Sequence, residues 1–283
     1  MKPTTLQTKL FLDSGDPVET QAILESLGFL DGQTTNPSLV AKNPDVQARI
    51  QKGSFRKEEL YDLYKDLAGE ISGLIPNGSV SVEVYADLDT RYDDMLSEAR
   101  QMNEWIPNAH VKLPITEVGL QVAQTLVSEG VNVNMTLCFT QEQAAAVYQA
   151  TQGSRKGQVF ISPFIGRLDD RGLNGMDLVR SIQRMYAEGD GHVQVLAASI
   201  RRLEHLMAAI SVGADIVTAP RAIYEEWQRA GSVVPDETYQ YRPQLDHIQY
   251  QEGLLDSTDL SIHHELTDAG LAKFASDWNA LLG

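Results

Sequence analysis

Short apolar runs alternate with longer amphipathic segments along most of this chain. The first pair is "KLFLD" followed by "DPVETQAILESLG", in which Asp16 fits a helix N-cap, Pro17 the first helical position and Gly28 the C-terminal cap. This pattern predicts a strand followed by a helix, and its repetition predicts a parallel sheet. Eight apolar runs are present, in residues 9–13, 29–38, 79–86, 110–116, 131–140, 158–166, 192–199 and 214–220.

Eight strand and helix units in one chain indicate an α/β fold of the (β/α)8 TIM-barrel type, not an open doubly wound sheet. We therefore expect residues 1–283 to form a single barrel domain with extra helices. Residues from about 228 to 264 are rich in Asp, Gln, Tyr and His without clear periodicity, which predicts an insert. A helical pattern resumes at about 265–283 and predicts a C-terminal helix.

The charge of the chain limits its partners. A formal net charge of -16 argues against binding to nucleic acid or a membrane surface, because both are polyanionic. A small anionic substrate remains possible if its site is locally basic. The single cysteine, Cys138, and the absence of a signal-peptide or membrane-spanning pattern lead us to expect a cytoplasmic protein. The histidines show no metal-ligand spacing such as HExxH, so we expect no metal site.

A lysine lies in the middle of the apolar run "HVKLP". Successive side chains of a strand point to opposite faces, so Val111 and Leu113 share one face and Lys112 takes the other. The apolar face is expected to pack on the helices, which turns Lys112 toward the barrel interior. The same parity turns further polar side chains inward, among them those of Asp13, Glu83, Asn134 and Thr136.

Charged groups in a barrel interior need an explanation, because an unpaired charge there costs several kcal/mol. One interpretation is a structural salt bridge between Lys112 and either Glu83 or Asp13. Buried ion pairs contribute little net stability, so an amine with two carboxylates and two hydrogen-bonding side chains favours a functional site. An amine that loses its hydration is more easily deprotonated, and a neutral amine attacks carbonyl carbons to form a Schiff base. The carboxylates would carry the protons.

Eight motifs follow one another in the chain: "LFLDSGD", "DGQTTNPSLV", "VEVYAD", "VKLPIT", "VNMTLCFT", "ISPFIGRLDD", "AASIR" and "DIVTAP". In this order they resemble the transaldolase family over roughly the first four-fifths of the chain. The resemblance implies a class I (β/α)8-barrel enzyme that needs no cofactor. It implies transfer of a dihydroxyacetone unit between sugar phosphates in the pentose phosphate pathway.

The resemblance also implies catalytic roles. Lys112 would be the Schiff-base nucleophile that attacks the C2 carbonyl of a ketose phosphate such as fructose 6-phosphate. Asp13 would take the proton of the C4 hydroxyl as the carbon to carbon bond breaks. Glu83 and Thr136 would hold a water that shuttles protons. The alternatives are an interior ion pair for the carboxylates and an ordinary strand residue for the threonine.

Three polar side chains are implied to bind hydroxyl groups of the three-carbon unit: those of Asn36, Asn134 and Ser162. For Asn36, "NPS" is also a natural turn before a helix. The phosphate is expected beside Arg167, Ser199 and Arg201, because guanidinium groups give bidentate hydrogen bonds to phosphate oxygens.

Two features beside the expected phosphate site have structural interpretations. Arg201 and Arg202 together could be a solvated pair at the start of a helix. Asp169, Asp170 and Arg171 fit surface ion pairs, worth at most about 1 kcal/mol each, which decide nothing about catalysis.

Three other functions compete with transaldolase. In the fructose 6-phosphate aldolase branch of the superfamily, a glutamine typically replaces Glu83 and a tyrosine replaces Phe164, so both residues favour transaldolase and place Phe164 in the substrate site. An enzyme acting on a sulfonated ketose and a catalytically silent binding barrel are the other two. The C-terminal helix either packs on a neighbouring subunit or covers its own barrel with Phe274 and Trp278. We expect a homo-oligomer.

Overall fold

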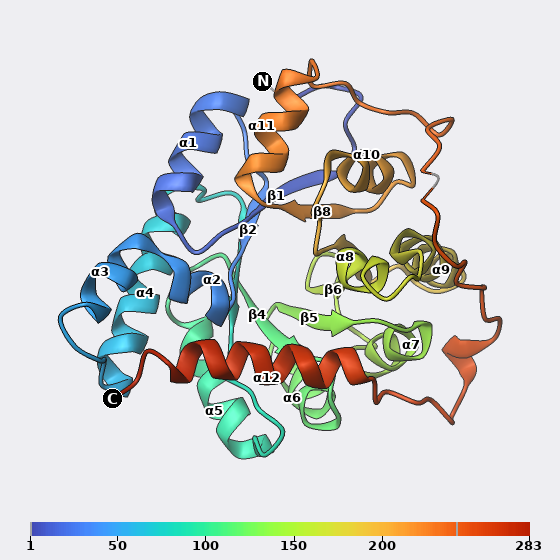
Figure 1. Cartoon of the computed structure of the whole chain (residues 1–283). Coiled ribbons are helices and arrows are strands. Elements are labelled where there is room, and N and C mark those ends of the chain that lie inside the picture. Colours follow the sequence, from blue (N-terminus) through green and yellow to red (C-terminus); the bar gives the residue numbers. More distant parts are fainter. Residues whose placement is uncertain (1, 242) are drawn as a thin grey trace.

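The computed structural model describes residues 2–241 and 243–283, and its centre is a closed barrel of eight parallel strands (Figure 1). Each strand pairs with the next one along the chain, and β8 pairs with β1. Each strand also overlaps one of the eight apolar runs, so the predicted TIM barrel is confirmed. The strands are β1 (Lys9–Asp13), β2 (Gly32–Thr34), β3 (Ser79–Glu83), β4 (Ala109–Pro114), β5 (Val133–Cys138), β6 (Val159–Pro163), β7 (Val193–Ala197) and β8 (Ile216–Ala219).

Helices surround the barrel and follow its strands (Figure 1). In the first helix, Asp16 accepts a hydrogen bond from the Val18 backbone N–H and Gly28 has a φ of 76°, so both predicted caps form. None of the described helices is long and apolar enough to cross a membrane. The helices are α1 (Pro17–Leu27), α2 (Pro37–Lys42), α3 (Pro44–Ile50), α4 (Lys57–Leu74), α5 (Tyr92–Asn103), α6 (Glu117–Ser128), α7 (Gln141–Ala150), α8 (Ile165–Asp169), α9 (Gly175–Ala187), α10 (Leu203–Ser211), α11 (Arg221–Arg229) and α12 (Glu265–Asn279).

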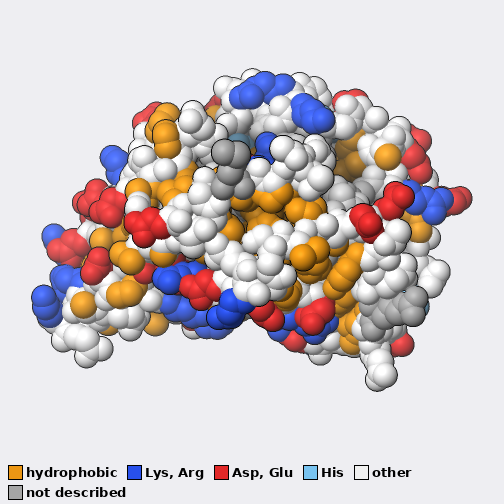
Figure 2. All heavy atoms as spheres, turned by 90° about the horizontal axis from the view of Figure 1, so that it is seen from above, with side chains coloured by type: hydrophobic (Ala, Val, Ile, Leu, Met, Phe, Trp, Pro, Cys, Tyr) orange, Lys and Arg blue, Asp and Glu red, His pale blue; other side chains and the backbone are white. Residues whose placement is uncertain are grey.

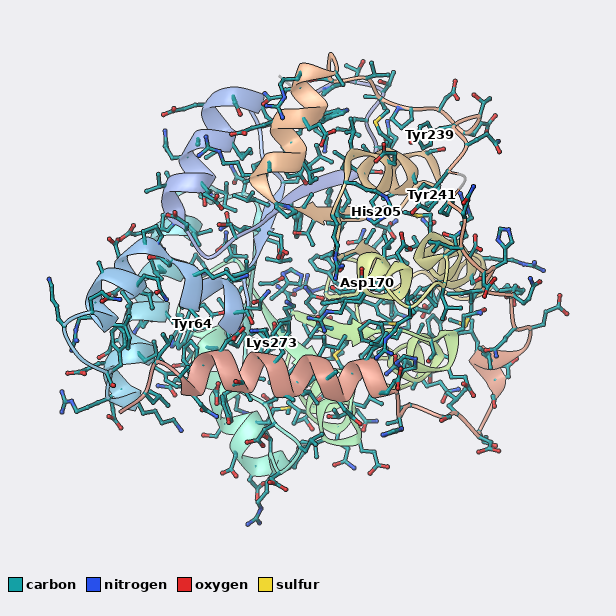
Figure 3. The ribbon with its side chains drawn as sticks, in the orientation of Figure 1. Tyr64, Asp170, His205, Tyr239, Tyr241 and Lys273 are labelled. Atoms are coloured by element: carbon teal, nitrogen blue, oxygen red, sulfur yellow. The ribbon has the colours of Figure 1, made fainter. Side chains whose placement is uncertain are left out.

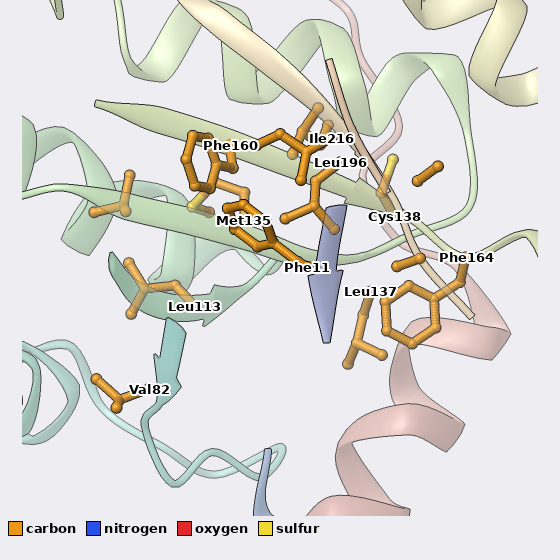
Figure 4. Close-up of a cluster of buried hydrophobic side chains, with 14 of the residues drawn as sticks. Phe11, Val82, Leu113, Met135, Leu137, Cys138, Phe160, Phe164, Leu196 and Ile216 are labelled. Atoms are coloured by element: carbon orange, nitrogen blue, oxygen red, sulfur yellow. The ribbon is translucent and has the colours of Figure 1, made fainter. Parts of the chain in front are cut away.

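The barrel has an apolar floor at the amino ends of its strands. The rings of Phe11 in β1 and Phe160 in β6 meet inside the barrel, with centroids 6.0 Å apart (Figure 4). His110 in β4 stacks on Phe160 at 4.0 Å. Val82 and Leu113 are fully buried in the apolar cluster that Figure 4 also shows. Packed rings thus fill the amino end of the barrel interior, and polar side chains line its carboxyl end.

The described parts of the segment between α11 and α12, residues 230–241 and 243–264, run over the outside of the helical ring (Figure 1). Its described part contains one short 3-10 helix, η1 (Leu254–Asp256). Gln149 of α7 donates hydrogen bonds to the carbonyls of Leu255 and Ser257, which ties this segment to the barrel wall.

Helix α12 lies across the carboxyl end of the barrel of its own chain (Figure 1). It contacts α2 and β5, and Phe274 and Trp278 are buried beneath it. Of the two arrangements open from sequence, the apolar face of this helix covers its own barrel. The surface shown in Figure 2 carries basic and acidic side chains side by side.

Candidate active site

A pocket of about 330 Å³ opens at the carboxyl end of the barrel. Asp13, Thr34 and Lys112 line it from strands β1, β2 and β4, and Phe274 closes it from α12. In barrels of this type, the carboxyl ends of the strands carry the active site. The pocket is therefore the candidate active site.

Lys112 and Glu83 form a buried ion pair. Their positions face each other across β3 and β4, and Lys112 Nζ lies 2.8 Å from Glu83 Oε2, with both side chains at most 4 % exposed. The amine also donates a hydrogen bond of 3.2 Å to the Thr35 carbonyl. Of the two carboxylates considered from sequence, Glu83 is the direct partner.

Asp13 is half-buried in the pocket wall. Its carboxylate accepts a hydrogen bond of 2.7 Å from the Thr34 hydroxyl, which also lies 2.7 Å from the Thr218 hydroxyl. Burial raises the pKa of Asp13, against the opposing effect of the Lys112 charge. Burial likewise raises the pKa of Glu83, although the positive charge of Lys112 acts in the opposite direction. Two carboxylates with raised pKa values beside one amine are typical of groups that exchange protons in a site.

The polar residues of β5 and β6 form a chain of hydrogen bonds inside the barrel. Ser162 donates to Asn134 Oδ1 at 2.7 Å, and Asn134 Nδ2 donates to Ser81 Oγ at 3.0 Å. Ser162 lines the pocket, whereas Asn134 lies behind it and holds it. The Thr136 hydroxyl is fully buried and has no hydrogen-bond partner among the described residues.

Arg167 lies between two aromatic rings at the pocket. Its Cζ is 5.0 Å from the ring centroid of Phe164 and 5.4 Å from that of Phe274, in cation–π geometry. A Cβ at Gly270 of α12 would lie 2.7 Å from Arg167 Nη1, so this helix approaches the guanidinium as closely as a glycine allows. Helix α12 therefore limits the space that the Arg167 guanidinium can occupy.

The "SPFIGR" and "AASIR" segments meet because β6 and β7 are neighbours. Gly166 N donates to the Ser199 carbonyl at 3.0 Å, and Ser199 has a left-handed φ of 58°. A Cβ at Gly166 would lie 2.7 Å from Arg201 Cδ, so the arginine stem can cross only a glycine here. Ser199, Arg201 and Arg167 all line the pocket, and Arg201 also pairs with Asp170.

Asn36 fits both of the roles considered from sequence, the start of a helix and a residue of the substrate pocket. Its Oδ1 accepts a hydrogen bond of 2.9 Å from Leu39 N and caps α2. It also lines the pocket. A helix cap and a contact with substrate are compatible, because the cap uses only the carbonyl oxygen of the amide.

Several pocket residues were not predicted from the sequence. Lys42, Lys273 and Asp277 line the rim, and Asp277 accepts hydrogen bonds from Lys273 and Ser38. Figure 3 labels Lys273 on α12. The apolar periodicity of α12 identified Phe274 as a packing residue, but nothing local shows that this packing face closes a pocket.

Asp169 does form an ion pair, with Arg202, but the interpretation of Asp169 as a surface residue is wrong. Its side chain is only 7 % exposed and accepts hydrogen bonds from several separate parts of the chain. Asp170 and Arg171 do form surface pairs, with Arg201 and Glu265.

A closed eight-stranded barrel with a charged pocket at its carboxyl end defines a (β/α)8-barrel protein of the enzyme type. The model of the transaldolase/fructose-6-phosphate aldolase family matches residues 10–283. The chain belongs to this family, as the motifs predict.

Known proteins of two kinds are similar to the chain. It is 36% identical over 273 residues to a probable transaldolase of Dehalococcoides mccartyi, covering 96% of this chain and 99% of that one. It is 35% identical over 270 residues to a probable transaldolase of Brucella ovis, covering 95% and 96%. The structure of 3-hexulose-6-phosphate synthase from Salmonella typhimurium matches with a TM-score of 0.51 at 12% identity, over 80% of this chain and 93% of that one. That last likeness concerns the fold alone.

Proposed function

We propose that this protein is a transaldolase that moves a dihydroxyacetone unit from fructose 6-phosphate or sedoheptulose 7-phosphate to an aldose phosphate, in the pentose phosphate pathway. The observation that carries the proposal is the buried Lys112 amine, 2.8 Å from Glu83 at the base of a pocket that Asp13 and two arginines line. A lysine is an effective nucleophile for carbonyl carbons when a nearby group manages its protons.

The first step forms the Schiff base. Lys112 passes a proton to Glu83, its neutral amine attacks the C2 carbonyl of the ketose, and the carbinolamine then loses water to give an iminium. The leaving hydroxyl needs a proton, and Glu83 supplies it through a water that Thr136 holds. Two features support this role: the raised pKa of Glu83 and the buried Thr136 hydroxyl, which has no partner among the described residues.

The second step breaks the bond between C3 and C4. Asp13 accepts the proton of the C4 hydroxyl, the C4 oxygen forms a carbonyl, and the bonding electrons move into the iminium to give an enamine. The aldose phosphate leaves, the enamine carbon attacks the aldehyde of the acceptor, and Asp13 returns its proton. Hydrolysis of the new iminium frees Lys112. The Thr34 hydrogen bond to Asp13 supports this role because it fixes the carboxylate at the pocket wall.

The phosphate of the substrate binds at the rim. Arg167, Ser199 and Arg201 line one side of the pocket, and the two arginines supply the local positive charge that a chain of net charge -16 needs for an anionic substrate. Asn36 and Ser162 bind hydroxyl groups of the three-carbon unit, with Asn134 behind Ser162.

A borohydride experiment tests the nucleophile. Incubation with fructose 6-phosphate and borohydride should trap a dihydroxyacetone adduct on Lys112, detected by peptide mass spectrometry. Lys42 and Lys273 also line the pocket and serve as internal controls, because the mechanism leaves them unmodified. An adduct on either of them, or none at all, would reject the proposal.

Turnover with and without an acceptor separates transfer from cleavage. Without erythrose 4-phosphate, a transaldolase releases one aldose phosphate per active site and then stops, whereas an aldolase goes on cleaving the donor alone. Glu83 and Phe164 stand where the aldolase branch typically has glutamine and tyrosine, so we expect dependence on the acceptor. Equal cleavage in its absence would identify an aldolase.

We further propose that the protein works in the cytoplasm, as one barrel domain with an inserted segment, and forms a homo-oligomer. Three large apolar side chains are strongly exposed among the described residues, those of Val18, Leu88 and Val233. Analytical ultracentrifugation would show a monomer if the oligomer proposal is wrong.

A further inference from the structure

The buried Asp169 carboxylate collects hydrogen bonds from three separate segments beside the pocket. Its Oδ2 accepts from Arg202 at 2.6 Å, from Tyr241 at 2.8 Å and from His205 Nε2 at 2.9 Å. Its Oδ1 accepts from Gly175 N at 3.0 Å. Tyr241 belongs to the segment of residues 230–264, to which the barrel chemistry gives no role. We call these four side chains, Asp169, Arg202, His205 and Tyr241, the Asp169 cluster.

His205 connects the cluster to the backbone of the phosphate side. Its Nε2 faces a carboxylate and therefore carries the proton, which leaves the Nδ1 lone pair free to accept. Arg201 N donates to this Nδ1 at 3.4 Å, a long but consistent hydrogen bond. The cluster thus supports the backbone that presents Arg201, two residues beyond the left-handed Ser199.

The cluster also separates two neighbouring arginines. Arg202 donates to both Asp169 and the Tyr241 hydroxyl, whereas Arg201 lines the pocket. Arg202 and Arg201 are adjacent in sequence and chemically alike, so either guanidinium group could bind an anion in the pocket unless the other contacts of each residue hold it elsewhere. Pairing with Asp169 and Tyr241 commits Arg202 to the cluster.

The hydroxyl of Tyr241 is suited to act as a permanent hydrogen-bond donor to Asp169. Burial, followed by its hydrogen bond to Asp169, raises its pKa to about 12, so it keeps its proton at neutral pH. Figure 3 shows Tyr241 and His205 close together beside α10, with Tyr239 farther along the same segment. Tyr239 contributes no hydroxyl to the four hydrogen bonds of Asp169 described above.

We propose that Tyr241 is a positioning residue for phosphate recognition: by completing the Asp169 cluster, it keeps Arg202 out of the pocket and fixes the backbone that presents Arg201 and Ser199. The inference rests on the proposed function, because the ligand is the phosphate group of the sugar phosphate. It gives the 230–264 segment a role in affinity for phosphate and none in bond chemistry.

The test compares Tyr241→Phe with Tyr239→Phe as the matched control. For Tyr241→Phe we expect KM for fructose 6-phosphate and the inhibition constant of inorganic phosphate to rise about fivefold, with kcat within about twofold of the parent, since two charge-assisted hydrogen bonds are lost, one to Asp169 and one from Arg202. Trapping of unphosphorylated dihydroxyacetone on Lys112 should proceed at an unchanged rate. Tyr239→Phe should match the parent in all these measurements.

Asp169→Asn provides a second variant, because it weakens the acceptor that all members share. We expect a larger rise in KM than for Tyr241→Phe, and melting curves show whether each variant is folded. Unchanged KM and inhibition constants in Tyr241→Phe would overturn the inference, whatever Asp169→Asn does. So would an equal loss with dihydroxyacetone, which points to general damage of the pocket.

The inference and the proposed function fail in different ways. If the parent protein neither turns over fructose 6-phosphate nor forms an adduct, the proposed function is wrong. Binding of inorganic phosphate, measured by calorimetry, then still tests the cluster: weaker binding in Tyr241→Phe supports it, and equal binding rejects it.

Discussion

Two residues of β4, His110 and Lys112, share one strand and one interior face, yet they belong to different ends of the barrel. His110, near the amino end, is 6 % exposed, with Nδ1 2.7 Å from Ser79 Oγ and Nε2 3.0 Å from the Gly157 carbonyl. Because the carbonyl can only accept, Nε2 carries the proton and Nδ1 accepts from Ser79. Burial lowers the pKa of His110 to about 4, so the ring stays neutral.

Lys112, two residues further along, is as deeply buried but faces other ionisable groups. Glu83 pairs with it, Asp13 lies on the same pocket, and the pKa values of both carboxylates are raised. A buried polar group stabilises the fold when all of its hydrogen-bond donors and acceptors are paired within the protein. A buried group that keeps a titratable partner and an opening to a pocket is equipped for chemistry.

The largest expected effect comes from removing the amine. Lys112→Met should lower turnover of fructose 6-phosphate by at least about 10⁴-fold and abolish the borohydride adduct, because no other group replaces the nucleophile. Lys65→Met, on the exposed face of α4, is the control and should behave like the parent. Residual adduct formation in Lys112→Met would break the contrast between the two ends of the barrel.

Neutral replacement of either carboxylate should have the next largest effect. Asp13→Asn and Glu83→Gln should each lower kcat by about 10² to 10⁴-fold, the usual contribution of a general acid or base. Asp13→Asn should still form the adduct with dihydroxyacetone, since no bond to C4 exists in that molecule. Rapid-quench measurements distinguish the two steps, and loss of adduct formation in Asp13→Asn would reassign this residue to Schiff-base formation.

The pH dependence follows from the raised pKa of Asp13. Its carboxylate form is needed, so kcat should fall as the pH drops through a value above the ordinary 3.8 of an aspartic acid.

The same shift predicts how stability depends on pH. A carboxyl group whose pKa is higher in the folded than in the unfolded protein contributes stability at a pH below its unfolded pKa, and this stability is lost as the pH rises through the folded pKa. Asp13→Asn should therefore melt at a higher temperature than the parent at pH 7, and the difference should vanish near pH 3. A lower melting temperature at pH 7 would contradict the direction of this shift.

A change in α12 should affect substrate affinity. In Gly270→Ala, the new methyl group meets Arg167 Nη1 and the Leu137 side chain, both of which can move. We expect KM for fructose 6-phosphate to rise about threefold to tenfold while kcat is kept, because the guanidinium leaves its place between Phe164 and Phe274. Gly69→Ala in α4, where a Cβ meets nothing within 4 Å, is the control. Equal KM values in both variants would remove α12 from phosphate binding.

The smallest effect on catalysis is expected at the amino end. His110→Ala should lower the free energy of unfolding by about 3 kcal/mol, because it removes a ring stacked on Phe160 and two hydrogen bonds. The kcat of the folded variant should stay within about twofold of the parent. Urea unfolding and steady-state kinetics on the same preparation check both values, and a large loss of kcat would mean that the two ends are coupled.

The strands and the inward direction of their polar residues could be predicted because both are local properties. A period of two residues assigns Lys112 and Glu83 to one face whatever the rest of the chain does. The contribution of α12 could not be predicted in this way. Phe274 and Gly270 meet Arg167 more than 100 positions away, and many packing arrangements satisfy the same apolar stripe.

Asp169 shows the same limit on a smaller scale. In sequence it is one of two aspartates in a charged turn, and such residues are usually solvated. Only the approach of Tyr241, from a segment without periodicity, and of His205, from the next strand and helix unit, makes it a buried acceptor.

The sequence by itself determined the barrel, its family and the set of polar groups inside it, because alternation and short motifs are encoded residue by residue. The tertiary structure decided which carboxylate pairs with Lys112, which arginine faces the pocket and what covers the site. Those outcomes depend on distances of a few ångström between distant segments, and the packing of the whole chain sets them.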